Sequence, residues 1–349
     1  MRRATPLLAA ALLALTASPA SAATIRVPQD QPTIGAAVAF AAKDDTVRID
    51  CGVYYEHDIR VRRTLTILGA SDSPQCVTVD AESQGRVFIL ESARDSWIEG
   101  MTLRNGSNAI SFQQNSYSVS VRNCVLMDNT SAAISAHEGA GNLVNCQIRG
   151  NDRVASISSF AGLVLQDCLV IDNTSSFQGL VYATQGGNVT ILRTIFAGNT
   201  GADCVEAGSS GTITVRESTF FRNSACFRAG SMGTVNIQRS LFAFNVALGS
   251  ASPNGTLSAS CIDSYGHVGD DYPPGFPSPP PASGNFSADP LFCDAEYGKL
   301  GLRPRSPCLP GNHPDGASCG LVGALGEGCG EFPLVIEGRS WGHIKSAYR

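Results

Sequence analysis

The sequence repeats a short unit in which a small residue stands five positions before an asparagine. Three copies read NCVLMDN at 123–129, NCQIRGN at 145–151 and DCLVIDN at 167–173. A period of 22 to 26 residues predicts a solenoid, because a coil of that length cannot bury its apolar side alone. The aligned asparagines are Asn105, Asn129, Asn151, Asn173, Asn199, Asn223 and Asn245.

Short apolar segments flank each unit and are typical of strands. One precedes the small residue and a second follows the asparagine. Coils stacked about 4.8 Å apart as parallel strands would place equivalent residues above one another. The first expected stack is Val121, Leu143, Leu165, Ile191, Val215 and Ile237. The second is Ile110, Ile134, Ile157, Val181, Val205 and Phe227. We predict an all-β solenoid whose asparagines occupy a turn and bond to one another.

The small residues form a second column, which decides whether the cysteines are functional. Its members are Gly100, Cys124, Cys146, Cys168, Thr194, Ser218 and Ser240, with Cys261 as the expected extension. Structural zinc sites need cysteine pairs two to four residues apart, and a catalytic thiol needs a neighbouring base. Neither is present in these units, so we interpret the column as small buried residues.

The N-terminal residues MRRATPLLAAALLALTASPASAA predict a signal peptide at 1–22. Arg2 and Arg3 precede a short apolar stretch, and Ala20 to Ala22 have the small residues of a cleavage site. No later window has the roughly 20 apolar residues of a membrane span. We therefore expect a secreted or periplasmic protein. Without Arg2 and Arg3 the balance is 25 − 2 = 23 basic against 30 acidic residues, with no basic run, so nucleic acid is not an expected partner.

At this point the chain resembles the right-handed parallel β-helix, or pectin lyase-like, superfamily. The segment TIRVPQDQPTIGAAVAFAAKDDTVRIDCGVYYE is similar to the N-terminal opening of secreted β-helix proteins. Within it, Ile34, Ala37, Val38 and Ala41 have the spacing of a short helix that covers the end of the core. The resemblance implies a right-handed β-helix over 23–262. It implies no single activity, since this superfamily includes lyases, hydrolases, epimerases and adhesins.

The last third has a different composition and is expected to close the solenoid. Residues 263–330 are rich in proline, glycine and cysteine, and DPLFC, SPCLPG and CGLVGALGEGC are similar to the disulfide-bearing tails of bacterial β-helices. Residues 331–349 place Trp341, Ile344 and Tyr348 on one helical face, which favours a capping helix over a partner-binding peptide.

Eight of the twelve cysteines are disulfide candidates, since export permits disulfides. Sequence does not determine connectivity, and the pairs we consider join neighbouring coils or close the tail. They are Cys51–Cys76, Cys204–Cys226, Cys293–Cys308 and Cys319–Cys329.

The outward side chains beside the second strand are the candidates for binding a ligand. The first expected row is Ser111, Ser135, Ser158, Tyr182, Glu206 and Arg228, and the next begins Gln113, His137, Phe160 and Thr184. We predict that Tyr182, Glu206, Arg228 and His137 bind extracellular polysaccharide. Glu206 and Arg228 on adjacent coils are interpreted as a surface ion pair.

Two resemblances would imply catalysis in place of binding alone. GADCVEAGS at 201–209 is similar to a polygalacturonase motif, but only Asp203 matches it, and the next coil lacks the histidine of that family. The resemblance to pectate lyases implies an arginine or lysine base with calcium held by carboxylates. Arg228 would be that base, with Asp203 or Glu206 as the acids. A non-catalytic surface scaffold or adhesin is the third alternative.

One loop has the ligand types of a calcium site. CIDSYGHVGDDY at 261–272 places Asp263, Asp270 and Asp271 near flexible glycines, although without the spacing of an EF-hand. The alternative is an ordinary solvated loop. We expect calcium as the only candidate cofactor and a monomeric protein.

Overall fold

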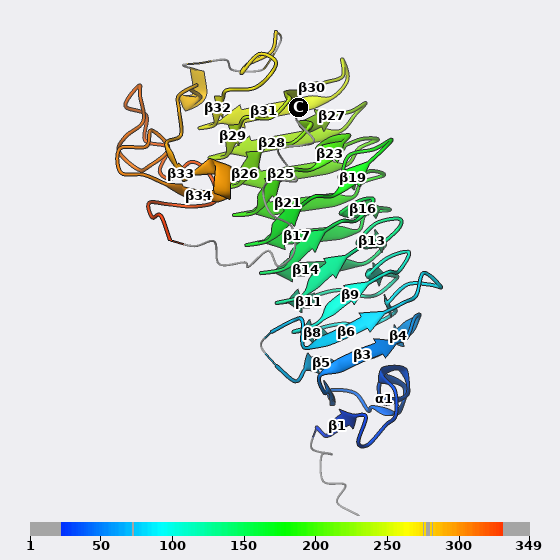
Figure 1. Ribbon diagram of the computed structural model, residues 1–349. Helices are drawn as coiled ribbons and strands as arrows, with labels where there is room; N and C mark the ends of the chain where they lie inside the picture. Colours follow the sequence, from blue (N-terminus) through cyan, green and yellow to red (C-terminus); the bar gives the residue numbers. More distant parts are fainter. Residues whose placement is uncertain (1–21, 72, 275, 277–279, 281, 331–349) are drawn as a thin grey trace, which may run out of the picture.

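The computed structural model describes residues 22–71, 73–274, 276, 280 and 282–330. Its strands wind in a right-handed parallel solenoid of about 11 turns, which confirms the predicted fold (Figure 1). Residues 1–21 of the expected signal peptide and the expected helix at 331–349 lie outside the described residues. Within the described part of the chain, no helix has the length and apolarity to cross a membrane.

Three parallel sheets, which we name A, B and C, form the sides of the solenoid. In order along the axis, sheet A consists of β1 (Thr24–Val27), β2 (Thr46–Ile49), β5 (Thr66–Gly69), β8 (Trp97–Glu99), β11 (Val119–Arg122), β14 (Ala140–Val144), β17 (Gly162–Gln166), β21 (Asn188–Leu192), β25 (Thr212–Arg216), β28 (Thr234–Gln238) and β31 (Thr256–Ser260). Sheet B consists of β3 (Gly52–Tyr55), β6 (Val77–Asp80), β9 (Thr102–Arg104), β12 (Val125–Met127), β15 (Gln147–Arg149), β18 (Leu169–Ile171), β22 (Ile195–Ala197), β26 (Thr219–Phe221), β29 (Leu241–Ala243) and β32 (Asp263–Tyr265).

Sheet C carries the predicted site. It consists of β4 (Ile59–Val61), β7 (Phe88–Leu90), β10 (Ile110–Phe112), β13 (Ile134–His137), β16 (Ala155–Ser158), β20 (Val181–Ala183), β24 (Asp203–Ala207), β27 (Ala225–Ala229) and β30 (Ala247–Ala251). Two short strands, β19 (Thr174–Ser175) and β23 (Thr200–Gly201), pair in the connections that lead into sheet C.

The register of sheet A confirms the first predicted stack. Val121 pairs with Leu143, and the same column continues through every coil to Ile237. The second stack was wrong at one coil, because Ala155 rather than Ile157 pairs with Ile134 and Val181. The connection from asparagine to sheet C varies in length, so a fixed repeat does not determine the register there.

The asparagine column is a continuous buried hydrogen-bond ladder. From Asn129 to Asn245, the backbone N–H and side-chain amide of each asparagine donate to Oδ1 of the next, at 2.8–3.1 Å. These side chains are at most 1% exposed. Their amides also donate to strand carbonyls, as Asn151 does to Leu126 at 3.1 Å. The ladder therefore satisfies polar groups that burial would otherwise leave unpaired.

The two ends of the ladder differ from the prediction. Gly106, not Asn105, donates its N–H to Oδ1 of Asn129, and Asn105 instead donates its side-chain amide to Asp80. At the other end, the N–H of Asn245 donates to Nδ1 of His267 at 3.1 Å. His267 thus ends the ladder, and the sequence period alone did not identify it because its residue type differs.

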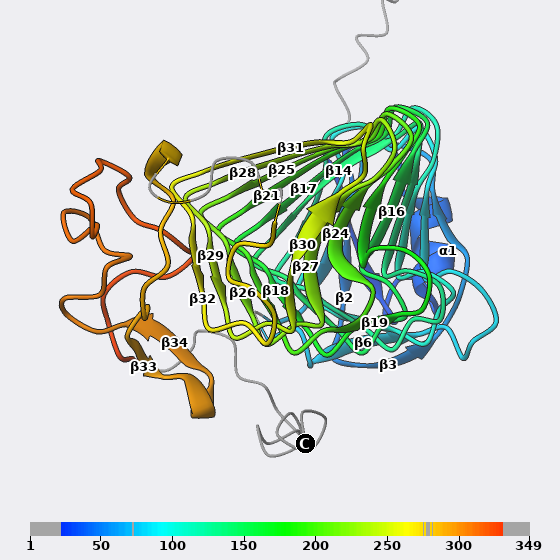
Figure 2. The same cartoon turned by 90° about the horizontal axis from the view of Figure 1, so that it is seen from above.

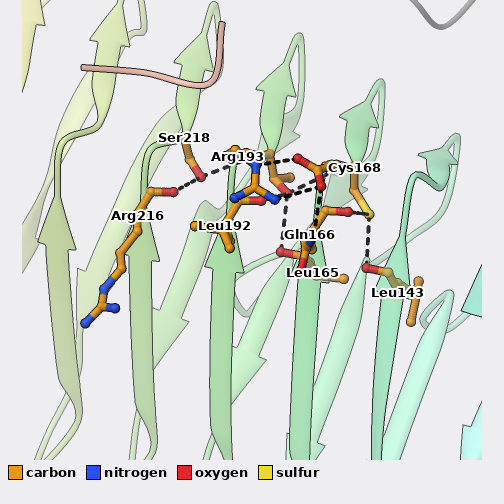
Figure 3. Close-up of polar contacts among 10 residues, drawn as sticks. Leu143, Leu165, Gln166, Cys168, Leu192, Arg193, Arg216 and Ser218 are labelled. Carbon is orange, nitrogen blue, oxygen red and sulfur yellow. Dashed lines mark hydrogen bonds and ion pairs between the residues drawn. The ribbon is translucent and has the colours of Figure 1, made fainter. Parts of the chain in front are cut away.

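The small column contains buried hydroxyls and thiols bonded to nearby carbonyls. In Figure 3, Sγ of Cys168 lies 3.3 Å from the carbonyl of Gln166, and Oγ of Ser218 donates to the carbonyl of Arg216 at 2.8 Å. Burial raises the pKa of the Cys124 thiol to about 12, so it does not form a thiolate at neutral pH. These contacts agree with the structural interpretation of the column.

The prediction of this small column is wrong by one residue at both ends. The strand pairing aligns Met101, not Gly100, with Cys124, and Ile262, not Cys261, with Ser240. Cys261 occupies the preceding corner position, where φ is 52°. A repeat one residue longer or shorter than its neighbours shifts every assignment that depends on counting.

The ends of the core are covered by the predicted N-terminal helix and by part of the predicted cap at 263–330. Helix α1 (Ile34–Phe40) buries Ile34, Ala37 and Val38 at the first coil, as expected. At the last coil Phe276 joins the core, with its ring centroid 6.2 Å from that of Phe227.

The cysteine-rich segment covers a side of the solenoid. Figure 2 shows the antiparallel pair β33 (Phe292–Asp294) and β34 (Lys299–Leu302) beside sheet B. The 3-10 helices η1 (Ala282–Gly284) and η2 (Ala295–Tyr297) belong to the same segment. It packs on the outer residues of sheet B, which include Leu169, Ile171, Ile195, Ala197, Phe221, Leu241 and Ala243. The cysteine-rich segment therefore shields the apolar outer face of sheet B from solvent.

One predicted disulfide is present and the other pairings were wrong. Cys51 pairs with Cys76, whereas the remaining bridges are Cys261–Cys319 and Cys293–Cys329. Cys204, Cys226 and Cys308 are buried thiols. Cys204 and Cys226 occupy equivalent positions on adjacent parallel strands, with both thiols buried in the core.

The ladder predicts a large difference between buried and exposed asparagines. Asn173→Ala removes two backbone-carbonyl partners and breaks the ladder in both directions, so we expect a loss of about 3 kcal/mol in unfolding free energy. The exposed Asn142→Ala on sheet A should cost less than about 0.5 kcal/mol. Urea unfolding measures both. Equal midpoints for the two variants would show that the ladder does not stabilise the fold.

His267 predicts an acid-sensitive end of the ladder. Burial holds its pKa below the ordinary value of about 6.5, so folding favours the neutral ring. The stabilisation is present above pH 6.5 and is lost as pH falls through the folded-state pKa. We expect His267→Asn, which supplies an amide oxygen at the same position, to weaken the drop in melting temperature between pH 7 and pH 5. An unchanged pH profile would contradict this.

Candidate functional site

The outward row of sheet C brings three of the predicted residues onto adjacent strands. Tyr182 pairs with Glu206, and Glu206 pairs with Arg228. The residue before Tyr182 in this row is Ser156, not Ser158 as predicted. His137 lies in the next row, where it pairs with Ser158 rather than with the predicted Phe160, and its Nδ1 lies 3.4 Å from Oγ of that serine. The predicted first row therefore holds except that Ser156 takes the place of Ser158.

Asp203 joins this face because β24 is not a regular strand at its start. Residues three apart in a regular strand point to opposite faces. In β24, however, both Cys204 and Val205 are fully buried, so Asp203 and Glu206 lie on the outer side together. β27 repeats the pattern, with Cys226 and Phe227 both buried before Arg228. The sequence does not reveal this irregularity, because two consecutive apolar residues can also occur at the end of a regular strand.

Glu206 is held in place by the preceding coil. Its Oε2 accepts the N–H of Gly179 at 2.7 Å, and its side chain is only 14% exposed. A Cβ at residue 179 would lie 2.5 Å from Cβ of Glu206, so only glycine leaves room for the carboxylate. Gly179 is a residue that sequence reasoning missed. In the sequence, Gly179 cannot be distinguished from an ordinary turn glycine.

Arg228 and Asp203 complete a cluster that we call the charged cluster: Asp203, Glu206 and Arg228. Nε of Arg228 lies 4.0 Å from Oε1 of Glu206, which agrees with the predicted ion pair, and the guanidinium side chain is 50% exposed. Burial, followed by the nearby Glu206, raises the pKa of Asp203 to about 6, while Arg228 opposes this shift. The cluster thus offers an acceptor held in place by the backbone, a carboxyl whose pKa is about 6 and a half-exposed donor.

Tyr182 leans away from the charged cluster, although it shares the row. Its Oη lies 3.1 Å from the point where a Cβ on Gly208 would be, towards the end of the strand that leads to sheet A. Phe160, 88% exposed, lies against Gly186 at the same end. Glu206 leans in the opposite direction, onto Gly179. The outward row therefore divides into an aromatic end and a charged end.

The three carboxyls predicted as calcium ligands have separate partners or face solvent. Oδ1 of Asp263 accepts the N–H of Ala288, and burial raises the pKa of Asp263 to about 8. Asp271 accepts from Ser287 and the N–H of His267, and Asp270 is exposed. In the described residues, no three acidic, histidine or cysteine side chains are grouped to hold a metal.

The comparisons with known proteins agree with this geometry at the level of the fold. A family model described as the right handed beta helix region matches residues 87–242. The chain is a right-handed parallel β-helix. The structure is similar to the crystal structure of pectate lyase Pel9A, with a TM-score of 0.58 and 12% identity over 88% of this chain and 97% of that one.

Two further solved structures are similar over part of the β-helix. An alginate lyase from Paenibacillus sp. str. FPU-7 gives a TM-score of 0.42 with 10% identity, over 69% of this chain and 99% of that one. A pectin methylesterase gives 0.40 with 14% identity, over 78% and 82%. No curated protein matches the sequence. The likeness to pectate lyase Pel9A, at 12% identity, shows the fold alone, and function has to be argued from the site.

Asp203 predicts a pH-dependent effect on stability. Because its folded-state pKa of about 6 lies above the ordinary value of 3.8, its contribution to stability is present below pH 3.8 and is lost as pH rises through 6. Asp203→Asn should therefore be more stable than the wild type at pH 8, by roughly 2 kcal/mol, and equal to it near pH 4.

A matched control has the opposite sign. Two hydrogen bonds from Arg193 hold the pKa of Asp167 below its ordinary value, so Asp167→Asn should lose stability at pH 8. Melting temperatures of the three proteins at both pH values test the pair. A shift of the same sign in both variants would show that Asp203 is not buried as described.

Proposed function

We propose that this protein binds an extracellular polysaccharide on the outer face of sheet C, through the charged cluster. The observation that carries the proposal is the fixed Glu206 carboxylate beside the half-exposed Arg228. A carboxylate accepts hydrogen bonds from sugar hydroxyls, and a guanidinium donates to hydroxyl or carboxylate oxygens. Because the backbone holds Glu206 before any ligand arrives, little ordering is needed on binding.

The setting outside the cytoplasm supports this proposal. Three disulfides join cysteines of the described chain, and such bonds persist in oxidising compartments. The predicted signal peptide is consistent with export. Pectate lyase Pel9A shares the fold, which makes polysaccharide a reasonable first class of ligand to test.

Cleavage of the polysaccharide is a weaker alternative. A lyase of the pectate type would use Arg228 as its base, but an arginine guanidinium ordinarily carries its proton in proteins and then cannot accept another. The acidic side chains available for calcium are Asp203 and Glu206, and Glu206 is already bonded to Gly179 and near Arg228. The lyase interpretation therefore stays a prediction for experiment, as does the scaffold or adhesin interpretation.

Binding and cleavage are separated by one experiment. The mature protein is incubated with neutral pyranose polymers and with uronate polymers, with calcium or chelator, while retention and the ultraviolet absorbance of unsaturated uronides are followed. We expect retention of at least one polymer without absorbance, and Arg228→Gln should weaken it about tenfold by removing the open donor. Arg216→Gln, an exposed arginine on sheet A, is the control.

Each other outcome has a definite meaning. Appearance of absorbance in the wild type would establish the lyase. Retention that is equal in both arginine variants would move the binding surface away from the charged cluster. Neither retention nor product with any polymer would leave the scaffold interpretation and overturn the proposed function.

A further inference from the structure

Phe177 is an apolar side chain that the fold leaves in solvent beside the charged cluster. Its side chain is 94% exposed, in the connection between β19 and β20. A fully exposed phenylalanine gains nothing from folding, because its ring stays in water in both states. Isolated exposed apolar residues are common on proteins, so its position and its support decide whether it has a role.

The backbone around Phe177 is anchored on both sides. Before it, Thr174 and Ser175 pair with Thr200 and Gly201 of the next coil. After it, Oε1 of Gln178 accepts from Arg153 at 2.8 Å. The following residues are held as well, since the N–H of Gly179 donates to Glu206 and that of Leu180 to the carbonyl of Asp203 at 2.8 Å. The ring is thus carried on a backbone already ordered by contacts with the charged cluster.

The position of Phe177 relates it to Glu206 rather than to Tyr182. It lies two residues before Gly179, so its Cα is within about 7 Å of the amide that holds the Glu206 carboxylate. Glu206 leans towards this loop, whereas Tyr182 leans over Gly208 at the other end of the strand. The loop that carries Phe177 and the carboxylate of Glu206 therefore meet at one edge of sheet C, and Arg228 lies on the other side of that carboxylate.

We propose that Phe177 is a stacking platform for one pyranose ring of the bound polysaccharide, whose hydroxyls meet Asp203, Glu206 and Arg228. This inference rests on the proposed function. A pyranose ring combines an apolar C–H face with a rim of hydroxyls, which matches an aromatic surface bordered by a few placed polar groups. A protein partner would fit less well, because the neighbouring Ser176 and Thr174 are exposed and polar and do not extend the apolar surface.

Phe160 provides a matched control for the experiment. It is also a nearly fully exposed phenylalanine next to a sheet C strand, but it lies against Gly186 at the aromatic end. Phe177→Ala, Phe177→Trp and Phe160→Ala are compared with the wild type for the dissociation constant of a soluble oligosaccharide from the polymer that the wild type retains. Melting temperatures are measured in parallel. Neither alanine variant removes a buried contact, so we expect no melting shift from Phe177→Ala.

The expected result is specific to one ring. Phe177→Ala should bind about tenfold more weakly, while Phe177→Trp and Phe160→Ala stay within about twofold of the wild type. If the polymer carries carboxylates, Arg228→Gln should weaken its binding more than that of its methyl ester. Phe177→Ala should weaken both forms equally, because stacking does not depend on charge.

The failures can be told apart. A wild type that binds while Phe177→Ala keeps the same affinity, or while both phenylalanine variants lose it equally, overturns the platform and leaves the proposed function. A wild type that binds no polymer overturns both. A tryptophan variant as weak as the alanine variant would also contradict stacking, since tryptophan offers a larger aromatic face.

Discussion

The rest of the structure depends on the buried asparagine ladder. An amide placed inside a protein without partners costs about as much as a lost hydrogen bond or more, so each asparagine requires a neighbour directly above and below it. The bonds from Asn129 to Asn245 supply these neighbours and set the coils in register. His267 ends the series with a ring nitrogen, because the last amide N–H still needs an acceptor.

The ladder constrains one part of each coil and leaves another free to vary. Sheets A and B stay in register on either side of it, whereas the connection into sheet C differs from coil to coil. After Asn151 the sheet C strand begins at Ala155, but after Asn173 it begins only at Val181. The longer connection contains Phe177 and Gly179, and Gly179 binds Glu206. The site therefore arises where the repeat has the most freedom, which is common for binding surfaces on rigid scaffolds.

Two carboxyls of one strand acquire different properties from their surroundings. Glu206 receives a backbone N–H and lies near Arg228, which fixes the position of its carboxylate. Burial raises the pKa of the Asp203 carboxyl to about 6. The cluster thus presents an acceptor, a group that changes protonation in mildly acidic medium and a cation, within one face.

The sequence indicated helix α1 from its apolar spacing, and by itself it determined the solenoid, the sheet A stack, the interior of the asparagine ladder and the buried small column. These features follow from one demand repeated in every coil, so a period and a residue type are enough to reveal them. Only the tertiary structure decided which way Glu206 and Tyr182 lean, that Asp203 shares their face, and that the tail covers sheet B. Those outcomes depend on contacts between particular, non-repeating segments. The bridge between Cys261 and Cys319, 58 residues apart, is one such contact that no period predicts.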